Sequence, residues 1–351
     1  MKSKSIDIHS LVRENITKLK PYASAKSDFK DFKQDLTFLD ANENPFDKGW
    51  NRYPDPDQSE LKKALSKIKG IPEENMLLGN GSDEILDMIF RVFCEPKIDN
   101  IIINVPTFGM YKVLAEVNDI NYRSVLLTDE YQLDISSIVD KIGSNTKLIF
   151  ICSPNNPTGN LIRKEDILDL LSKLTNTIIV IDEAYIDFSN AVSWLNEVNN
   201  YNNLIIIQTL SKAYGMAGLR LGICYAQTKI IDILKKIKMP YNVNVLSQKK
   251  AINELYKTDE LKSELNQIAT SKKVLEKELK SIDFVKNVYH SDTNFLLVKV
   301  DDANKRYKQL IQKQIVVRNR TNEPLCENCL RFTIGTASEI KKLINALKTL
   351  R

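Results

Sequence analysis

Short apolar runs alternate with helix-forming segments between residues 100 and 226, and this alternation is the feature that most constrains the fold. Runs of this length are typical of buried strands, and the segments between them are long enough for crossover helices. Strands connected in this way lie side by side and point in the same direction. The pattern therefore predicts an α/β domain with a mostly parallel central sheet flanked by helices. The runs are Ile101–Val105, Tyr122–Leu127, Leu148–Cys152, Ile178–Ile181, Leu204–Ile207 and Leu221–Tyr225.

Unusual residues follow several of these runs. Binding sites of parallel sheets lie beyond the carboxyl ends of the strands, which is where these residues are expected. Phe108 offers a flat apolar face, and Asn156 offers an amide fixed between Asn155 and Pro157. Core packing or a tight turn would explain either residue alone. Together with a carboxylate and a lysine at other strand ends, they indicate one chemical site.

Asp182 directly follows the apolar run that ends at Ile181. A carboxylate at this position would be nearly buried, which is costly unless a cation pairs with it. A protonated pyridine nitrogen would be such a partner, and a pyridinium ring is an electron sink. Tyr185, three residues later, can donate a hydrogen bond to a phenolate oxygen.

Lys212 follows the apolar run Leu204–Ile207. Poor solvation at the mouth of a buried strand favours the neutral, nucleophilic form of a lysine. Small residues around Lys212 leave space for a bulky group, and Arg220 offers a fixed cation. This combination suits a cofactor that forms a Schiff base and carries a phosphate. A lysine that extends from a surface loop would explain Lys212 alone equally well.

A glycine turn at Gly79–Gly81 joins a short strand to a helix that begins near Ser82 and Asp83. Free backbone N–H groups at the start of a helix suit a phosphate, and glycines allow close approach. Capping of the helix by Ser82 is the simpler alternative. The segment is not a P-loop, because the Gly-Lys-Ser/Thr sequence is missing.

Composition narrows the class of protein. A chain of 351 residues exceeds one ordinary core, so we expect two domains. Its net charge of +5 is dispersed, which does not predict a nucleic-acid interface. No apolar run approaches the roughly 20 residues of a membrane span, and no apolar signal segment follows the first charges.

Five cysteines are a low, odd number, so we expect a reduced, cytoplasmic protein without a metal site. Cys326 and Cys329 form a Cys-x-x-Cys pair, but two further zinc ligands are lacking, so we interpret the pair as structural.

Long charged helices and short strands after residue 226 predict a smaller α+β domain. We expect a large domain at 41–240, the smaller domain at 241–351, and an N-terminal arm at 1–40 with a helix from Ile8 to Leu19 that contributes to the smaller domain. Arg331 lies in a strand-like run with apolar neighbours, where burial without an anion is expensive. An anionic substrate group or a structural ion pair would compensate the charge of Arg331, and an outward orientation would leave it in solvent.

Several motifs resemble those of fold-type I pyridoxal-phosphate aminotransferases, in order and over essentially the whole chain. They are Ser153–Gly159 (SPNNPTG), Asp182–Tyr185 (DEAY), Ser211-Lys212 with Arg220, and Leu330–Gly335 (LRFTIG). Within these enzymes the chain is most similar to the histidinol-phosphate aminotransferases of the class II subfamily. That narrower resemblance rests on Pro21-Tyr22, Asn51–Asp55 (NRYPD), Gly79–Glu84 (GNGSDE), Pro106–Tyr111 (PTFGMY) and Thr293-Asn294.

The resemblance implies how pyridoxal 5′-phosphate (PLP) is bound. Lys212 would hold it as a Schiff base and transfer the proton, and Asp182 would pair with the pyridinium nitrogen. Asn156 and Tyr185 would bond the phenolate oxygen. Phe108 would stack on the ring, where many relatives have tyrosine. The phosphate would lie among Ser82, Asp83, Ser211 and Arg220.

The resemblance also implies the substrates: L-histidinol phosphate and 2-oxoglutarate, giving imidazole-acetol phosphate and L-glutamate in histidine biosynthesis. Tyr53 would come from the partner subunit of a homodimer with shared active sites. Either Arg318 or Arg320 would face the substrate. An aromatic amino-acid aminotransferase or a threonine-phosphate decarboxylase would keep every cofactor residue, so both stay open as alternatives. The residues implied to bind substrate are Tyr22, Tyr53, Asn294, Arg318 and Arg331.

Overall fold

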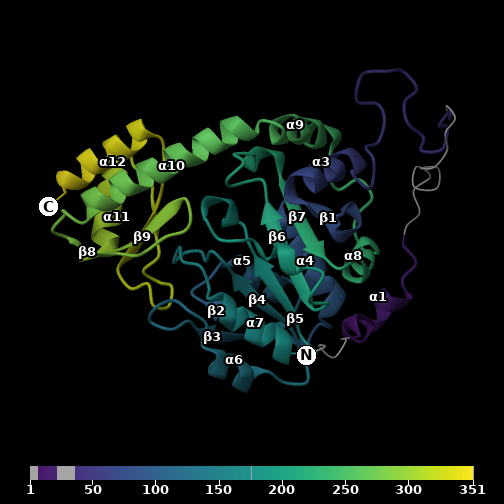
Figure 1. The fold of residues 1–351 in the computed structure, drawn as a ribbon, viewed down its shortest axis with the longest axis horizontal. Coiled ribbons are helices and arrows are strands. Elements are labelled where there is room, and N and C mark those ends of the chain that lie inside the picture. The colour runs from purple at the N-terminus through teal and green to yellow at the C-terminus, as the bar shows by residue number, and fades with distance from the viewer. Residues whose placement is uncertain (1–6, 22–35, 175, 351) are drawn as a thin grey trace.

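The computed structural model describes residues 7–21, 36–174 and 176–350. Within them, strands between residues 76 and 226 form a seven-stranded sheet of order β1-β7-β6-β5-β4-β2-β3. Figure 1 shows this sheet at the centre of the larger part of the molecule, with helices around it. Its strands are β1 (Met76–Asn80), β2 (Asn100–Val105), β3 (Asn121–Leu126), β4 (Thr146–Cys152), β5 (Ile178–Asp182), β6 (Leu204–Thr209) and β7 (Leu221–Ala226).

The sheet is mostly parallel, which confirms the predicted fold class. Strands β2 to β6 pair in parallel, whereas β7 is antiparallel to both β6 and β1. The chain reverses after β6 because the connection from Leu210 to Arg220 contains no crossover helix. The carboxyl ends of β1, β2, β4, β5 and β6 therefore meet at one edge of the sheet, and the β6–β7 connection lies at the same edge.

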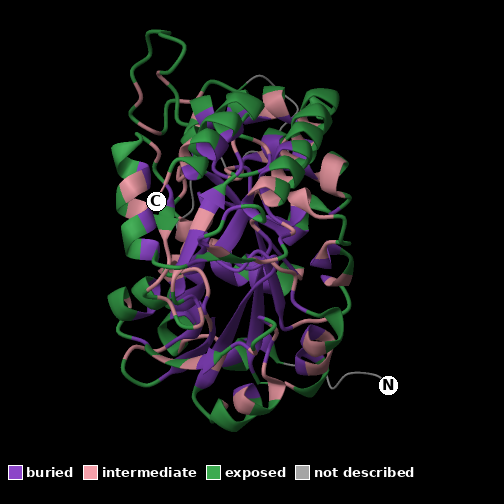
Figure 2. Ribbon diagram, turned by 90° about the vertical axis from the view of Figure 1, so that its left-hand side faces the viewer, coloured by how far each residue is buried: buried purple, intermediate pink, exposed green. Residues whose placement is uncertain are grey.

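Helices cover both faces of the sheet. Successive residues of a strand point to opposite faces. In β5, Ile179 and Ile181 pack in the core with α3, α6, α7 and α9, whereas Ile178 and Val180 pack in the core with α4, α5 and α8. Figure 2 shows the buried strands enclosed by helices with exposed outer surfaces. The helices are α3 (Ser59–Lys69), α4 (Ser82–Phe93), α5 (Met110–Val117), α6 (Ile135–Lys141), α7 (Lys164–Lys173), α8 (Thr228–Lys235) and α9 (Val245–Leu255).

A second, antiparallel sheet of order β10-β11-β9-β8 forms the smaller part of the molecule. Helices α10 and α12 pack on it around a separate core that includes Leu275, Leu296 and Leu343. Leu297 points to the other face of β9 and joins a core of the larger sheet, so the two parts are packed together. The elements are α10 (Thr258–Leu279), β8 (Val285–Val288), β9 (Phe295–Val300), α11 (Ala303–Gln312), β10 (Arg318–Asn319), β11 (Cys329–Thr333) and α12 (Ala337–Lys348).

Two local expectations were wrong. The helix predicted from Ile8 to Leu19 is broken into two short pieces, because Val12 has an extended backbone and Arg13 turns to form an ion pair with Glu95 at 3.0 Å. Ser82 is the first residue of α4, not its N-cap; Gly81 occupies the cap position with φ +80°. The short helices are η1 (Ile8–Leu11), α1 (Glu14–Lys18), η2 (Glu73–Asn75), η3 (Ile186–Phe188), η4 (Trp194–Glu197) and η5 (Ala217–Leu219).

None of the helices in the described part of the chain is long and apolar enough to cross a membrane.

Candidate active site

A cavity of about 150 Å³ lies at the edge of the sheet where the strand ends meet. All of the residues expected to bind the cofactor line it, although they come from five separate segments of the chain. The parallel strands bring these segments together because each one follows a strand at the same edge. The residues are Ser82, Asp83, Phe108, Asn156, Asp182, Tyr185, Ser211, Lys212 and Arg220.

Asp182, the last residue of β5, is buried at the floor of the cavity. One of its carboxylate oxygens accepts a hydrogen bond from the hydroxyl of Tyr111 at 2.7 Å, and the other accepts from the backbone N–H of Ala184 at 3.0 Å. Burial raises the pKa of the Asp182 carboxyl, and the Tyr111 hydroxyl opposes that shift. No described lysine or arginine forms an ion pair with Asp182. A buried carboxylate without such a partner can pair with a positively charged ring nitrogen.

Lys212 extends from the loop after β6, with its amine 5.7 Å from the centre of the Tyr185 ring. The side chain is accessible to solvent, yet the enclosing protein atoms lower the pKa of the amine. Burial contributes most to this shift, followed by the positive charge of Arg331. A lowered pKa raises the fraction of neutral amine, which is the form that attacks a carbonyl carbon.

The side-chain amide of Asn156 connects two other functional side chains. Its nitrogen donates to the hydroxyl of Tyr185 at 3.4 Å, and its oxygen accepts a hydrogen bond from the guanidinium of Arg331. Burial raises the pKa of Tyr185, so its phenol stays protonated and remains a donor at neutral pH. The ring of Tyr185 packs edge-on against Phe295 at 5.2 Å.

Part of the cavity lining suits an anion. The first turn of α4 and the guanidinium of Arg220 both line the cavity, and a helix start favours negative charge. Arg220 also lies 3.5 Å from the carboxylate of Asp83. A Cβ atom on Gly222 would lie 2.4 Å from the backbone nitrogen of Ser82, so only glycine lets β7 approach the helix start this closely.

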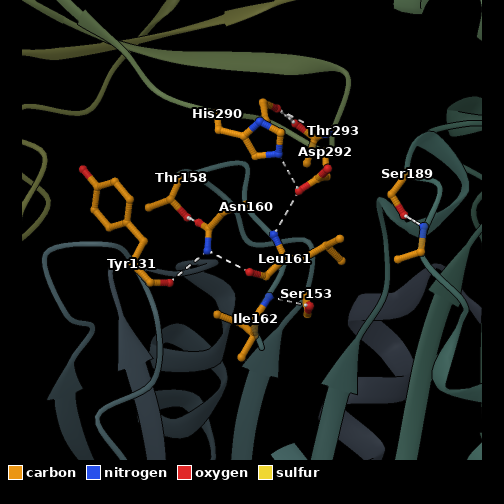
Figure 3. Close-up of polar contacts among 12 residues, drawn as sticks. Tyr131, Ser153, Thr158, Asn160, Leu161, Ile162, Ser189, His290, Asp292 and Thr293 are labelled. Carbon is orange, nitrogen blue, oxygen red and sulfur yellow. Dashed lines mark hydrogen bonds and ion pairs between the residues drawn. The ribbon is translucent and has the colours of Figure 1, made fainter. Parts of the chain in front are cut away.

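The loop after β4, which carries Asn156, is held by contacts on both of its sides (Figure 3). Asp292 of the smaller domain donates its backbone N–H to the carbonyl of Gly159 at 2.7 Å and accepts from the N–H of Leu161 at 3.2 Å. On the other side, the side chain of Asn160 donates to the carbonyl of Tyr131 at 2.9 Å. The position of Asn156 therefore depends on both domains.

The residues expected to bind substrate are less closely gathered. Arg331 contacts Asn156, which lines the cavity. Its Nε atom is buried without a hydrogen-bond partner among the described residues, and burial lowers its pKa to about 10. Arg318 lies opposite Arg331 in the β10–β11 register and is exposed, whereas Arg320 lies 3.5 Å from Glu323. The carbonyl of Asn294, beside β9, accepts from the N–H of Ile334 at 2.8 Å.

Tyr53, expected at the substrate, does not line the cavity of this chain. Tyr53 is exposed and stacks on Tyr241 with ring centres 4.5 Å apart. Tyr22 lies outside the described residues.

Sequence reasoning did not assign a role to Tyr111, although its hydroxyl contacts Asp182 directly. The sequence did contain a signal for Tyr111, because this residue is the last one of the Pro106–Tyr111 motif that carries the family resemblance. Cys152, Ala184, Thr209 and Ala217 also line the cavity without having been predicted.

Cys326 and Cys329 are buried free thiols. No cluster of three or more histidine, cysteine or acidic side chains that could hold a metal occurs in the described ranges.

Comparison with known proteins places the chain in a family. The model of the aminotransferase class I and II family matches residues 26–347. Over 347 residues the chain is 53% identical to the histidinol-phosphate aminotransferase of Christiangramia forsetii, covering 99% of each protein.

Two solved structures share the fold. The crystal structure of the histidinol-phosphate aminotransferase from Clostridium acetobutylicum has a TM-score of 0.79 and 29% identity, covering 86% of this chain and 91% of that one. The enzyme of the same name from Sinorhizobium meliloti, crystallised with PLP, has a TM-score of 0.78 and 23% identity, covering 86% and 84%. The resemblance seen in the sequence motifs is therefore confirmed. The chain belongs to the class I and II aminotransferases and, within them, to the histidinol-phosphate aminotransferases, which use PLP.

Proposed function

We propose that the chain transfers the amino group of L-histidinol phosphate to 2-oxoglutarate, giving imidazole-acetol phosphate and L-glutamate. The full-length relatives of that name support the substrate. The observation that carries the chemistry is the buried carboxylate of Asp182, which forms no ion pair with a described lysine or arginine and lines the same cavity as Lys212. PLP, when bound, supplies an electron sink that stabilises negative charge at the substrate carbon. Side chains of this protein attach the cofactor, transfer the proton and bind the substrates.

Lys212 has two roles in this proposal. Its amine would attach the cofactor covalently. When the substrate amine takes that place, the free Lys212 amine would remove a proton from the substrate carbon and deliver it to the cofactor carbon that carries the amino nitrogen. Its lowered pKa supports both roles, because only the neutral amine can attack or accept a proton.

The other cavity residues bind and orient. Asp182 keeps a proton on the ring nitrogen, while Asn156 and Tyr185 donate toward the ring hydroxyl oxygen. Phe108 covers one face of the ring. The start of α4, with Ser82 and Asp83, and the side chains of Ser211 and Arg220 hold the phosphate. All four residues line the cavity, and Arg220 lies beside Asp83, which supports this assignment.

Arg331 binds the anionic group of each substrate, which is a phosphate in histidinol phosphate and a carboxylate in glutamate. A guanidinium matches both groups with paired hydrogen bonds. Its neutral contact with Asn156 supports the role, because an arriving anion can displace an amide oxygen. Asn294 and Arg318, or Arg320 in place of Arg318, complete this end of the site, together with Tyr22.

The test of the reaction is a set of single half-reactions followed by visible absorbance. Histidinol phosphate, phenylalanine and threonine phosphate are each mixed with the PLP-loaded protein. We expect histidinol phosphate to convert the cofactor fastest. No conversion by histidinol phosphate, with rapid conversion by phenylalanine or release of CO₂ from threonine phosphate, would contradict the proposal.

We further propose a homodimer in which Tyr53 of each chain completes the partner's site. The segment around Tyr53 exposes large apolar side chains, which is unfavourable for an isolated chain. These are Leu39 (86% exposed), Phe46 (74%) and Trp50 (58%). Mixing an inactive Tyr53→Ala protein with an inactive Lys212→Ala protein should restore up to about a quarter of the activity, since one dimer in two is mixed and holds one intact site. No recovery after subunit exchange would count against shared sites.

We also propose that the protein works in the cytoplasm. All five cysteines are buried free thiols, a state that a reducing compartment maintains.

A further inference from the structure

We infer that Tyr111 is a positioning residue for Asp182, holding its carboxylate in place and in its charged form for the ring nitrogen of the cofactor. This inference rests on the proposed function, because it requires PLP in the cavity.

The geometry of the pair is well defined. The hydroxyl of Tyr111 donates to Oδ2 of Asp182 at 2.7 Å, and the side chains are 0% and 3% exposed. The Tyr111 ring is stacked on Phe150, with centres 4.8 Å apart, and meets Phe108 edge-on at 5.6 Å. Packing on both sides fixes the ring and holds the hydroxyl beside the Asp182 carboxylate.

The charge of Asp182 depends on such donors. Burial raises its pKa most, and the nearby Asp83 adds to the shift. The hydrogen bond from Tyr111 is the largest opposing effect, followed by the N–H of Ala184 and the charge of Lys212. A protonated carboxylic acid would not stabilise a positive ring nitrogen, so removing the strongest donor weakens the electron sink.

Tyr111 can hold this role over the whole working range of pH. Burial raises its own pKa well above the ordinary value, and the neighbouring Asp182 raises it further. The phenol therefore stays protonated and always acts as the donor in this pair.

A matched control is present in the same sheet. Tyr225 of β7 is also 0% exposed, and its hydroxyl is buried with no hydrogen-bond partner in the described part of the chain. Removing that hydroxyl changes a buried tyrosine in the same way without touching Asp182.

The experiment compares Tyr111→Phe, Tyr225→Phe, Asp182→Asn and the double variant Tyr111→Phe/Asp182→Asn. Two quantities are measured: the dissociation constant of PLP from the refilled apoprotein, and the ¹⁵N signal of PLP labelled at its ring nitrogen. Tyr111→Phe should weaken PLP binding by about tenfold, the effect of one hydrogen bond to a charged group. Its ¹⁵N signal should move toward the unprotonated position, while Tyr225→Phe should match the wild type.

The double variant separates positioning from packing. If Tyr111 acts through Asp182, Tyr111→Phe should cause no further change in the Asp182→Asn background. An unshifted ¹⁵N signal in Tyr111→Phe, or an equal loss of affinity in both backgrounds, would overturn the inference.

Tyr111→p-aminophenylalanine provides a second variant if Tyr111→Phe does not fold, because it keeps the six-membered ring and places an N–H donor where the hydroxyl was. It should keep the ¹⁵N signal near the wild-type position, and a signal shifted as far as in Asp182→Asn would overturn the inference. A wild-type protein that binds no PLP would contradict the proposed function itself. Normal wild-type binding with an unchanged Tyr111→Phe protein would overturn only the role of Tyr111.

Discussion

The guanidinium of Arg331, on β11 of the smaller domain, donates a hydrogen bond to the amide oxygen of Asn156, on the loop after β4 of the larger domain. The same amide donates to Tyr185, so one side chain joins the proposed anion-binding arginine to the proposed cofactor site. Binding of an anion by Arg331 therefore changes the surroundings of Asn156 directly.

Arg331→Gln should raise the KM for histidinol phosphate by about 100-fold, because a charge-assisted contact with the substrate anion is lost. The dissociation constant of PLP should change by less than about twofold, since Arg331 is not among the residues that line the cavity. Steady-state kinetics and PLP titration check both values. Arg163→Gln is the control, because Arg163 is exposed and lies 3.8 Å from Glu130. A variant that loses PLP as strongly as it loses substrate would refute this assignment.

Lys212→Ala should abolish covalent attachment of PLP and reduce turnover by at least about 1,000-fold, because the attaching amine and the base are both lost. Borohydride treatment followed by intact-protein mass spectrometry is the measurement. The wild type should gain the mass of one reduced cofactor per chain, as should Lys63→Ala, which alters an exposed lysine on α3. Retention of a reducible linkage in Lys212→Ala would place the attachment on another lysine.

Gly222→Ala should destabilise the protein by about 2 kcal/mol and weaken PLP binding. The added Cβ would lie 2.4 Å from the backbone nitrogen of Ser82, so β7 and the start of α4 must separate. Gly218→Ala is the matched control, since a Cβ there meets no atom within 4 Å. Thermal unfolding of both variants without PLP provides the comparison. Equal melting temperatures for Gly222→Ala and Gly218→Ala would show that β7 and the start of α4 can separate without loss of stability, which would contradict this prediction.

The ion pair between Asp301 and Arg306 should make stability depend on acid pH. Its oxygen and nitrogen are 2.6 Å apart, and hydrogen bonding to Arg306 lowers the pKa of Asp301 to about 2. A carboxylate whose folded pKa is lowered contributes stability above its unfolded pKa of roughly 4 and loses it as the pH falls toward 2. Asp301→Asn should therefore cost about 1 kcal/mol at pH 7, after allowance for the partial exposure of Asp301.

The difference between the wild type and Asp301→Asn should shrink between pH 4 and pH 2, as measured by urea unfolding at each pH. Glu130→Gln, which alters an exposed pair, should change stability by less than about 0.5 kcal/mol at every pH. A difference for Asp301→Asn that is constant across this range would rule out titration of Asp301 as the cause.

Much of the larger domain could be predicted because its strands are continuous apolar runs. The run ending at Ile181 predicted both a buried strand and an unusual carboxylate at its end, and the structure places Asp182 there. The same reasoning located Asn156 and Lys212, because parallel strands collect their carboxyl ends at one edge.

Contacts between distant residues could not be predicted in this way. Tyr111 and Asp182 are 71 positions apart, and neither periodicity nor propensity specifies which buried hydroxyl meets which carboxylate. The contact of Arg331 with Asn156 depends on how two domains pack. The break at Val12 follows from tertiary pairing of Arg13 with Glu95, which overrides local helix preference.

The length of the connection between β6 and β7 determines how far Lys212 lies from Arg220. Thr209 and Gly222 face each other in the antiparallel ladder, so both ends of the connection are fixed while Lys212 and Arg220 lie between them. The number of residues in this loop sets the distance between a covalent anchor and a cation. Inserting residues there would leave the sheet intact but would change the length of the molecule that the two side chains can hold at once.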